Sequence, residues 1–187
     1  WFIESCKKIS YLFPRAHAVA YVMVAFRIAW FKVYHPLAFY AAYFSIRAKA
    51  FDLRIMTGDL NTQLKEFNRI KALDRGASPK EKDLMSALEV SMEMYQRGYR
   101  FINVDIQHSG ARRFSIKDGA LLPPFLAIDS LGETVADAIV EERETKPFTS
   151  LKDLQRRCKV SATIIETMKE LKCCGDLPED EQMSLFG

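Results

Sequence analysis

Apolar residues fall at helical spacing along most of the chain, and they are densest near its start. Residues 14–34 carry a series that includes Val22 and Phe26 and leaves few polar positions. We predict one long helix here, with Pro14 in its first turn, a position that suits proline. The helix ends at His35-Pro36, because the residue before a proline avoids α geometry. A helix that is apolar almost all round is normally buried in a larger body.

A second predicted helix, from Pro36 to Lys49, is also rich in aromatic residues. Its apolar positions are Leu37, Phe39, Tyr40, Tyr43, Phe44 and Ile46. Two isolated helices could not bury so many aromatic side chains, so we expect residues 1–50 to pack on polypeptide outside the given sequence. The chain starts at Trp1 without an initiator Met, which also favours a piece of a longer chain.

No segment is predicted to cross a membrane or to direct export. The longest uninterrupted apolar run, from Ala18 to Phe26, has nine residues, whereas a spanning helix needs about 20. The apolar residues of 14–34 form no single stripe, which argues against a helix lying on a membrane surface. The first residues lack the basic segment of a signal peptide. We therefore expect a cytoplasmic protein with no membrane partner.

Two further helices are predicted in the middle of the chain. Residues 59–73 carry an apolar stripe at helical spacing, made of Leu60, Leu64, Phe67 and Leu73. The next helix starts with a capping box from Ser78 to Glu81, with Pro79 in its first turn. It stops at Gly98, since glycine commonly follows a helix C-terminus.

A small β element is predicted after Gly98. Residues 99–106 alternate enough to form one strand, and residues 113–117 form another. Asp118-Gly119 is a turn signal, and Pro123-Pro124 marks a boundary.

The last part of the chain is predicted to be helical again, with an irregular tail. We expect helices at 133–144, 150–158 and 161–173, arranged as two successive helical pairs. Residues 175–187 are acidic and contain Pro178, so we expect this tail to have no fixed structure. The fold class is therefore mainly α, with a small β element and a flexible C-terminal peptide.

The charge is distributed unevenly, although the formal net charge is only +3. Residues 1–50 carry seven Lys or Arg residues and one acid, whereas residues 176–187 carry four acids and no Lys or Arg. A basic beginning and an acidic end indicate different partners for the two ends. The four cysteines form no CxxC pair, so we expect reduced thiols and no zinc site.

No catalytic motif stands out, and composition and spacing alone do not indicate an enzyme. One candidate binding site is the start of the first long helix, where backbone N–H groups favour anions. Arg15, His17 and Tyr21, with Phe13 before them, could receive a nucleotide, with its triphosphate at the helix start and its base against a ring. The alternative is a capped, buried helix whose histidine is simply hydrogen-bonded.

A second candidate is a pair of helical hairpins that present backbone N–H groups to DNA phosphates, without reading base sequence. The two predicted turns comprise Ser130, Leu131 and Gly132, and Lys159, Val160 and Ser161. We expect Gly132 to adopt a positive φ. Glu133 argues against phosphate binding, and the alternative is two packed hairpins with no ligand.

The tail offers a third candidate, a short docking peptide after an acidic linker. It consists of Gln182, Met183, Ser184, Leu185 and Phe186. A glutamine amide forms two-sided hydrogen bonds, and Leu185 and Phe186 would fill an apolar pocket. The alternative is a ragged terminus with chance residues.

Taken together, these stretches resemble bacterial replicative DNA polymerase III of the PolC type, from residue 1 to residue 186. The resemblance is carried by Trp1–Ile9, Phe13–Tyr21, Phe31–Pro36, Tyr40–Ser45, Ala77–Leu84, Leu122–Phe125, Ala127–Asp129, Lys152–Arg157 and the tail motif. Departures are small: the family usually has Lys in place of Arg15, Gly in place of Ser130 and Leu in place of Met183. Exchanging Lys for Arg keeps the charge but alters the donor geometry.

The resemblance implies four parts. Residues 1–98 would form the C-terminal part of the polymerase fingers and contact the incoming deoxynucleoside triphosphate. Residues 99–123 would form a small β element, 124–176 a tandem helix–hairpin–helix that binds the primer–template duplex, and 177–187 a tail that binds the sliding clamp.

The resemblance also implies what lies elsewhere. The catalytic aspartates that hold Mg²⁺ would lie upstream in the palm, so that this chain contributes no catalytic residue and no metal ligand. The chain would work with the palm, the thumb and the rest of the fingers in the bacterial replisome. The alternative is a free-standing, non-enzymatic protein that binds DNA and tethers the clamp.

Overall fold

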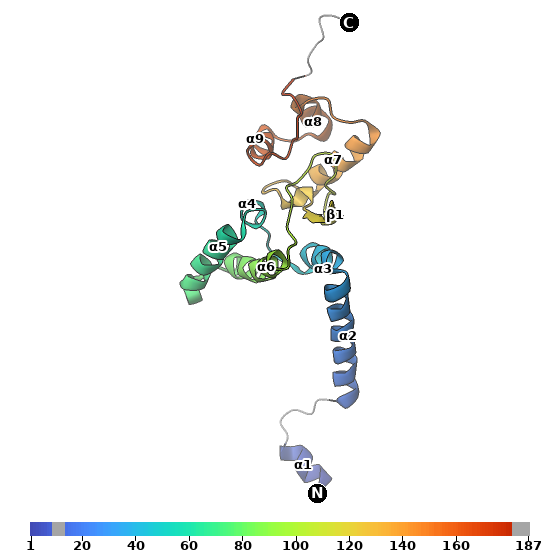
Figure 1. Cartoon of the computed structure of the whole chain (residues 1–187), viewed down its shortest axis with the longest axis vertical. Coiled ribbons are helices and arrows are strands. Elements are labelled where there is room, and N and C mark those ends of the chain that lie inside the picture. Colours follow the sequence, from blue (N-terminus) through green and yellow to red (C-terminus); the bar gives the residue numbers. More distant parts are fainter. Residues whose placement is uncertain (9–13, 181–187) are drawn as a thin grey trace, which may run out of the picture.

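The computed structural model describes residues 1–8 and 14–180, and it is elongated and mainly α-helical (Figure 1). A long helical rod extends away from the body on the N-terminal side, and the last helices form the opposite end (Figure 1). This arrangement confirms the predicted fold class of a mainly α chain with a small β element.

The N-terminal half consists of helices and short helical turns. They are α1 (Phe2–Lys8), α2 (Arg15–Tyr34), α3 (Pro36–Ala42), the π-helical turn η1 (Tyr43–Arg47), α4 (Leu53–Met56), α5 (Leu60–Leu73), the 3₁₀ turn η2 (Asp74–Gly76) and α6 (Pro79–Gln96). The C-terminal half adds β1 (Ser115–Lys117), β2 (Ala120–Leu122), the 3₁₀ turn η3 (Phe125–Ala127), α7 (Glu133–Thr145), α8 (Leu151–Cys158) and α9 (Ala162–Glu170).

Helix boundaries follow the predicted signals closely. Pro14 stands just before α2 as its N-cap with extended backbone, one position earlier than expected, and His35 closes the helix. The capping box of α6 is complete: the Ser78 hydroxyl accepts from the Glu81 N–H, and the Glu81 carboxylate accepts from the Ser78 N–H. Gly98 ends this region with a φ of 86°. The second predicted helix is shorter than expected and widens into the π-helical turn η1 after Ala42.

The helix predicted at 59–73 is present as α5, and Phe67 of its apolar stripe packs against the central core, but the stripe does not supply the fully buried positions. Leu64 and Leu73 are 45% and 41% exposed, whereas Gln63 and Ile70 are the buried residues of this helix. Both ends of the buried Gln63 amide are hydrogen-bonded. Its Nε2 donates to the Met56 carbonyl at 3.1 Å, and its Oε1 accepts from Ser91 Oγ at 2.7 Å. Buried polar groups need hydrogen-bond partners, and the Gln63 amide has them, so Gln63 occupies a buried position of α5.

The strand expected at 99–106 is also wrong. This segment makes one isolated parallel bridge, between Phe101 and Leu121, and then continues as a loop whose Ile106 N–H donates to the carbonyl of Cys173. β1 lies within the predicted strand at 113–117, and across the predicted 118–119 turn it pairs with β2, a strand that was not predicted, with Ile116 opposite Leu121. β2 is only three residues long, so a third strand has little edge to pair with.

Two apolar cores hold the body together. The central core lies between α3, α5 and α6, and its largest fully buried members are Tyr40, Met56, Ile70, Leu88, Met94 and Leu121. The hairpin core lies among η3, α7, α8 and α9, and its largest fully buried members are Phe125, Ile128, Ile139, Leu154 and Met168. Leu53 of α4 also packs into the hairpin core, so the two halves share contacts.

Helix α2 lies outside both cores. Within the described part of the chain it buries none of its 20 residues. Val22 is 52% and Phe26 is 72% exposed. The helix is also long and apolar enough to cross a membrane, by length and composition alone. Core helices of soluble proteins meet the same criteria of length and composition.

The tail differs from the prediction as far as the structure describes it. Residues 177–180 form no helix or strand, but they lie against α8, where the Leu151 N–H donates to the Pro178 carbonyl at 2.8 Å. Leu177 packs against the hairpin core. The contact arises because unpaired N–H groups at a helix start donate to well-placed carbonyl oxygens.

Candidate nucleic-acid interface

The first predicted hairpin is a tight turn that leads into α7. It differs from the prediction on one side, because a single 3₁₀ turn, η3, stands where a preceding helix was expected. The Ile128 carbonyl accepts from the Leu131 N–H at 3.2 Å, and Leu131 is buried in the hairpin core. The buried Leu131 side chain therefore anchors the turn, while the residues on either side of it are exposed.

The backbone of this turn corrects the expectation for Gly132. The residue with positive φ is Ser130, at 65°, whereas Gly132 is the N-cap of α7 with a φ of −77°. A Cβ added to Gly132 would meet no atom within 4 Å. The glycine is therefore required neither by backbone strain nor by internal packing, and what it leaves open is the space in front of the helix start.

The N-terminus of α7 presents a set of backbone donors. The N–H groups of Gly132, Glu133 and Thr134 donate to no other described residue, and the first bond of the helix runs from the Ala136 N–H to the Gly132 carbonyl. Such donors, together with the helix dipole, favour an anion. This arrangement is what phosphate recognition by a hairpin requires.

Glu133, which argued against phosphate binding, is paired with a cation. Arg112 forms ion pairs with Glu133 and, at 2.5 Å, with Asp137. The hydrogen bond from Arg112 is the main reason that the pKa of Asp137 lies below its usual range. Arg112 belongs to none of the predicted sites, and the only sequence feature that could have indicated it is the pair of adjacent arginines, Arg112 and Arg113.

The second hairpin connects α8 to α9 and is built differently. Lys159 ends α8 in a left-handed conformation, with a φ of 54°. Val160 is buried in the hairpin core, and Ser161 caps α9 by accepting from the Ile164 N–H at 3.3 Å. The N–H groups of Ala162 and Thr163 donate to no other described residue. Both turns thus present helix-start donors, and the second adds a lysine.

A partly buried arginine connects the two hairpins. Arg157 of α8 donates from Nε to Glu142 Oε2 at 3.0 Å and from Nη1 to Asp153 Oδ2 at 3.2 Å. Its guanidinium also lies over the ring of Phe148 at 4.6 Å. Burial alone would raise the pKa of Asp153, but hydrogen bonds from the Thr149 N–H and the two neighbouring arginines outweigh it and lower that pKa. The sequence had indicated Arg157 only through the family resemblance.

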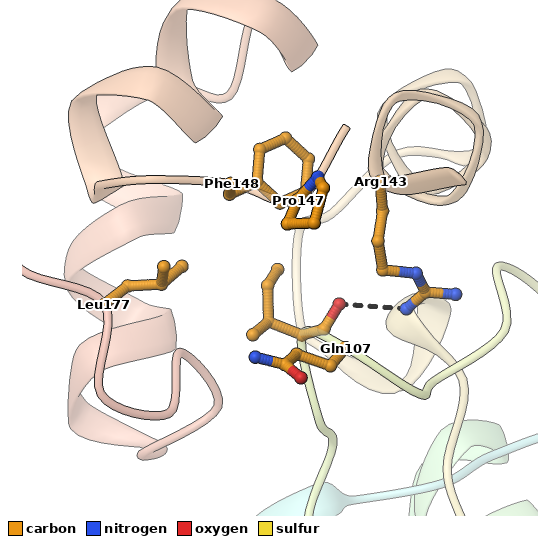
Figure 2. A pocket seen from close by; sticks show the side chains of 6 residues that line it. Gln107, Arg143, Pro147, Phe148 and Leu177 are labelled. Atoms are coloured by element: carbon orange, nitrogen blue, oxygen red, sulfur yellow. Dashed lines mark hydrogen bonds between the residues drawn. The ribbon is translucent and has the colours of Figure 1, made fainter. Parts of the chain in front are cut away.

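A small cavity of about 220 Å³ lies beside this junction. Figure 2 shows the side chains around it, with Leu177 opposite Arg143 and with Phe148 and Gln107 between them. Arg143 donates to the carbonyls of Ile106 at 2.9 Å and of Ser109 at 3.0 Å. Its guanidinium is thus engaged in holding the loop. The lining contains no carboxylate or thiol, so the cavity holds no constellation for catalysis.

The start of α2 carries the other predicted side chains. His17 and Tyr21 lie on one face, with ring centroids 4.5 Å apart and nearly edge-on. Arg15 is the first residue of the helix and is exposed. Phe13 lies outside the described residues, as do Gln182, Met183, Ser184, Leu185 and Phe186 of the tail motif. The structure therefore describes three of the four predicted nucleotide-site residues and none of the docking peptide.

Acidic and sulfur ligands do not converge in the described chain. Across residues 1–8 and 14–180, no group of three or more His, Cys, Asp or Glu residues could hold a metal ion. The cysteines are free thiols, and burial raises the pKa of Cys173 to about 12. A thiol with so high a pKa is a poor nucleophile at neutral pH.

Comparison with known proteins points in the same direction as the geometry. A family model described as a helix-hairpin-helix motif matches residues 98–183, which include both turns. The whole chain is 50% identical to a DNA polymerase III PolC-type of Caldanaerobacter subterraneus subsp. tengcongensis, over 186 residues. It is 47% identical over 188 residues to a DNA polymerase III PolC-type of Streptococcus pyogenes. The chain spans 13% of the length of each of these relatives, so it matches one segment of a PolC-type DNA polymerase III.

Proposed function

We propose that this chain is a working segment of a bacterial replicative DNA polymerase, which adds deoxynucleotides to a primer end under the direction of a template. The similarity to PolC-type DNA polymerase III along the whole chain carries the proposal. The exposed α2 supports it, because an apolar helix with no buried residue needs a covering body. The palm, the thumb and the remaining fingers of a cytoplasmic polymerase would supply that cover, and the palm would supply the catalytic carboxylates and Mg²⁺.

Within that enzyme, the two hairpins would hold the primer–template duplex by its phosphates. The donors at the starts of α7 and α9 support this role, and the ion pair with Arg112, which Asp137 shares, offsets part of the negative charge of Glu133. Contacts of this kind carry no sequence information. Binding should weaken with salt, with a log–log slope of about −0.9 for each phosphate neutralised.

Gly132→Asp tests the first hairpin in the parent polymerase. Aspartate is a favoured N-cap, and the space at this position is open, so α7 should keep or gain stability. The carboxylate would occupy the phosphate position, so duplex affinity should fall at least tenfold in fluorescence anisotropy. Gly76→Asp is the matched control, because its added Cβ also meets no atom within 4 Å and it lies in η2, away from the hairpins. Unchanged duplex affinity in Gly132→Asp would refute the contact.

Lys159→Gly tests the second hairpin. Glycine suits the left-handed backbone of this residue, so the substitution removes a cation without straining the turn. Duplex affinity should fall by a similar factor on unrelated sequences, and the salt slope should become shallower by about one unit. A loss confined to one sequence would contradict phosphate recognition.

The start of α2 would contact the incoming nucleotide. Arg15 would meet the triphosphate, with His17, Tyr21 and Phe13 around the base. A charged hydrogen bond to phosphate is worth about 1.5–3 kcal/mol. Arg15→Ala in the full enzyme should therefore raise the KM for all four deoxynucleotides and lower kcat, while Arg15→Lys retains most activity. Steady-state kinetics unchanged by Arg15→Ala would rule out this role.

The tail motif would bind the sliding clamp. Gln182 would hydrogen-bond to the clamp backbone, and Leu185 and Phe186 would enter an apolar pocket, with Met183 at its edge and Ser184 between them. A weak contact suffices, because a clamp that encircles DNA makes rebinding effectively intramolecular. Replacing Leu185 and Phe186 with Ala should abolish clamp-stimulated long synthesis but spare single-nucleotide insertion. Loss of both activities would instead indicate a damaged polymerase.

A further inference from the structure

The tail makes a set of contacts that the motif-based description does not account for. The Leu151 N–H donates to the Pro178 carbonyl at 2.8 Å, and the Lys152 N–H donates to the Glu179 carbonyl at 3.2 Å. These two donors are the first residues of α8, whose N–H groups have no partner inside the helix. The tail backbone therefore completes the capping of α8.

The same segment is also held by side chains. Glu179 pairs with Lys169 of α9 at 2.8 Å, and Asp180 pairs with Lys152 of α8 at 2.5 Å. Leu177 packs against the hairpin core and lines the cavity near Phe148 (Figure 2). Exposed ion pairs are individually weak, but here they add to two backbone hydrogen bonds and one apolar anchor.

The three helix starts of the hairpin region are consequently not equivalent. At α8 the first three N–H groups all have partners, two in the tail and the third in the Ser150 hydroxyl at 3.0 Å from the Asp153 N–H. At α7 and α9 the first two N–H groups have no partner among the described residues. The tail covers the helix start that lies outside the two hairpin turns and leaves both turns accessible.

We propose that residues 177–180 form a fixed strap across α8, so that a partner docked on residues 182–186 is held close to the duplex-binding hairpins. This inference rests on the proposed clamp-binding role of the motif. Gln182 follows Asp180 by two residues, so the clamp would start two residues from an anchored point. The acidic linker is then a short, positioned connection and not a long flexible tether.

Two insertions distinguish a strap from a flexible tail in the parent polymerase. Twelve Gly and Ser residues placed after Asp180 lengthen the connection beyond the strap, whereas the same residues placed after Asp176 lengthen it on the body side. Effective concentration falls roughly as the −3/2 power of the free linker length. The insertion after Asp180 should therefore lower clamp-stimulated processivity about tenfold, and the insertion after Asp176 should lower it less than twofold. Equal losses from both insertions would overturn the strap.

Hydrogen exchange provides a readout that does not depend on the clamp. In the full chain, the amides of Leu151 and Lys152 should exchange slowly, and Glu179→Gln combined with Asp180→Asn should speed them several-fold. The Asp153 amide, which donates to Ser150, is the internal control and should change little. Fast exchange of Leu151 and Lys152 in the unaltered protein would refute the strap.

The two experiments also separate this inference from the proposed function. Slow exchange at Leu151 and Lys152 combined with no clamp stimulation in the unaltered enzyme would overturn the clamp-binding role and, with it, the positioning of the clamp. Normal clamp stimulation with fast exchange, or with equal losses from both insertions, would overturn the strap and leave the clamp-binding role intact.

Discussion

Helix α2 is more apolar than the helices of the hairpin region, yet its apolar side chains are exposed whereas theirs are buried. Ile28 of α2 is 51% exposed, whereas Ile139 of α7 and Leu154 of α8 are 0% exposed. The hairpin region packs its own side chains into one core across η3, α7, α8 and α9. α2 instead projects from the body (Figure 1), so its apolar surface has no counterpart among the described residues. The difference shows that the hairpin region buries its apolar side chains among the described residues, whereas α2 does not.

The largest test of this contrast is to separate the two regions. A polypeptide of residues 98–187 should unfold in one cooperative transition, because the hairpin core is almost entirely internal to it. Residues 1–47 alone should aggregate or stay unfolded, since α2 exposes apolar side chains on all sides. Circular dichroism during urea titration and analytical ultracentrifugation would measure both. A soluble, folded monomer of residues 1–47 would remove the basis of the contrast.

Truncating one apolar side chain in each region should change the free energy of unfolding by very different amounts. Leu154→Ala should destabilise the chain by about 2–5 kcal/mol, because Leu154 is fully buried and leaves a cavity. Ile28→Ala should change the free energy of unfolding by less than about 0.5 kcal/mol, since an exposed side chain loses little packing.

The same pair of substitutions becomes more informative in the parent polymerase. There Ile28→Ala should become destabilising as well, because α2 would be covered. Thermal unfolding of both proteins would measure the change. If Ile28→Ala stays neutral in the parent polymerase, α2 is not a buried helix of that enzyme.

The junction between the two hairpins should respond to the loss of Arg157. Its side chain is 16% exposed, and its partner Asp153 is 5% exposed. Arg157→Ala should cost about 2–3 kcal/mol, because it leaves a buried carboxylate short of donors. Arg156→Ala is the control, since the Arg156 side chain is 72% exposed and should cost less than about 1 kcal/mol. Urea denaturation measures both, and equal losses would contradict the bridging role of Arg157.

The smallest expected effect concerns pH, in the loop that connects the two cores. Burial alone would raise the pKa of Asp105, but hydrogen bonds from Lys117, the Gln107 N–H and His108 outweigh it and lower the pKa to about 2. The folded-state pKa lies below the unfolded value, so the stabilisation is present above about pH 4 and is lost as pH falls toward 2. We expect about 1–2 kcal/mol, given partial exposure.

Asp105→Asn should remove this pH dependence and lower stability at neutral pH by the same amount. Asp118→Asn is the control, because Asp118 is exposed in the turn between β1 and β2 and asparagine tolerates its φ of 50°. Free energies of unfolding measured between pH 2 and 5 would test both. An unaltered pH profile in Asp105→Asn would show that another carboxyl group is responsible.

Local signals in the sequence predicted much of the helical fold. The Ser78–Glu81 capping box and His35-Pro36 set helix ends within one residue, because capping depends on side chains a few positions apart. The turns at 118–119 and 159–161 also lie where predicted, since glycine, or a residue that tolerates positive φ, marks such turns locally. Resemblance to a known family supplied the proposed functional roles, which spacing alone had left open.

Tertiary structure decided what depends on distant partners. Gln63 is buried in place of Leu64 because Met56 and Ser91 satisfy its amide, and the 99–106 segment is a loop because β2 offers it only one bridge. Likewise, Arg112 pairs with Glu133 from 21 positions away, and the strap at 177–180 exists because the start of α8 supplies unpaired N–H groups. Sequence patterns specify a residue's immediate neighbours along the chain, whereas burial, ion pairing and capping across the fold depend on which elements meet in space.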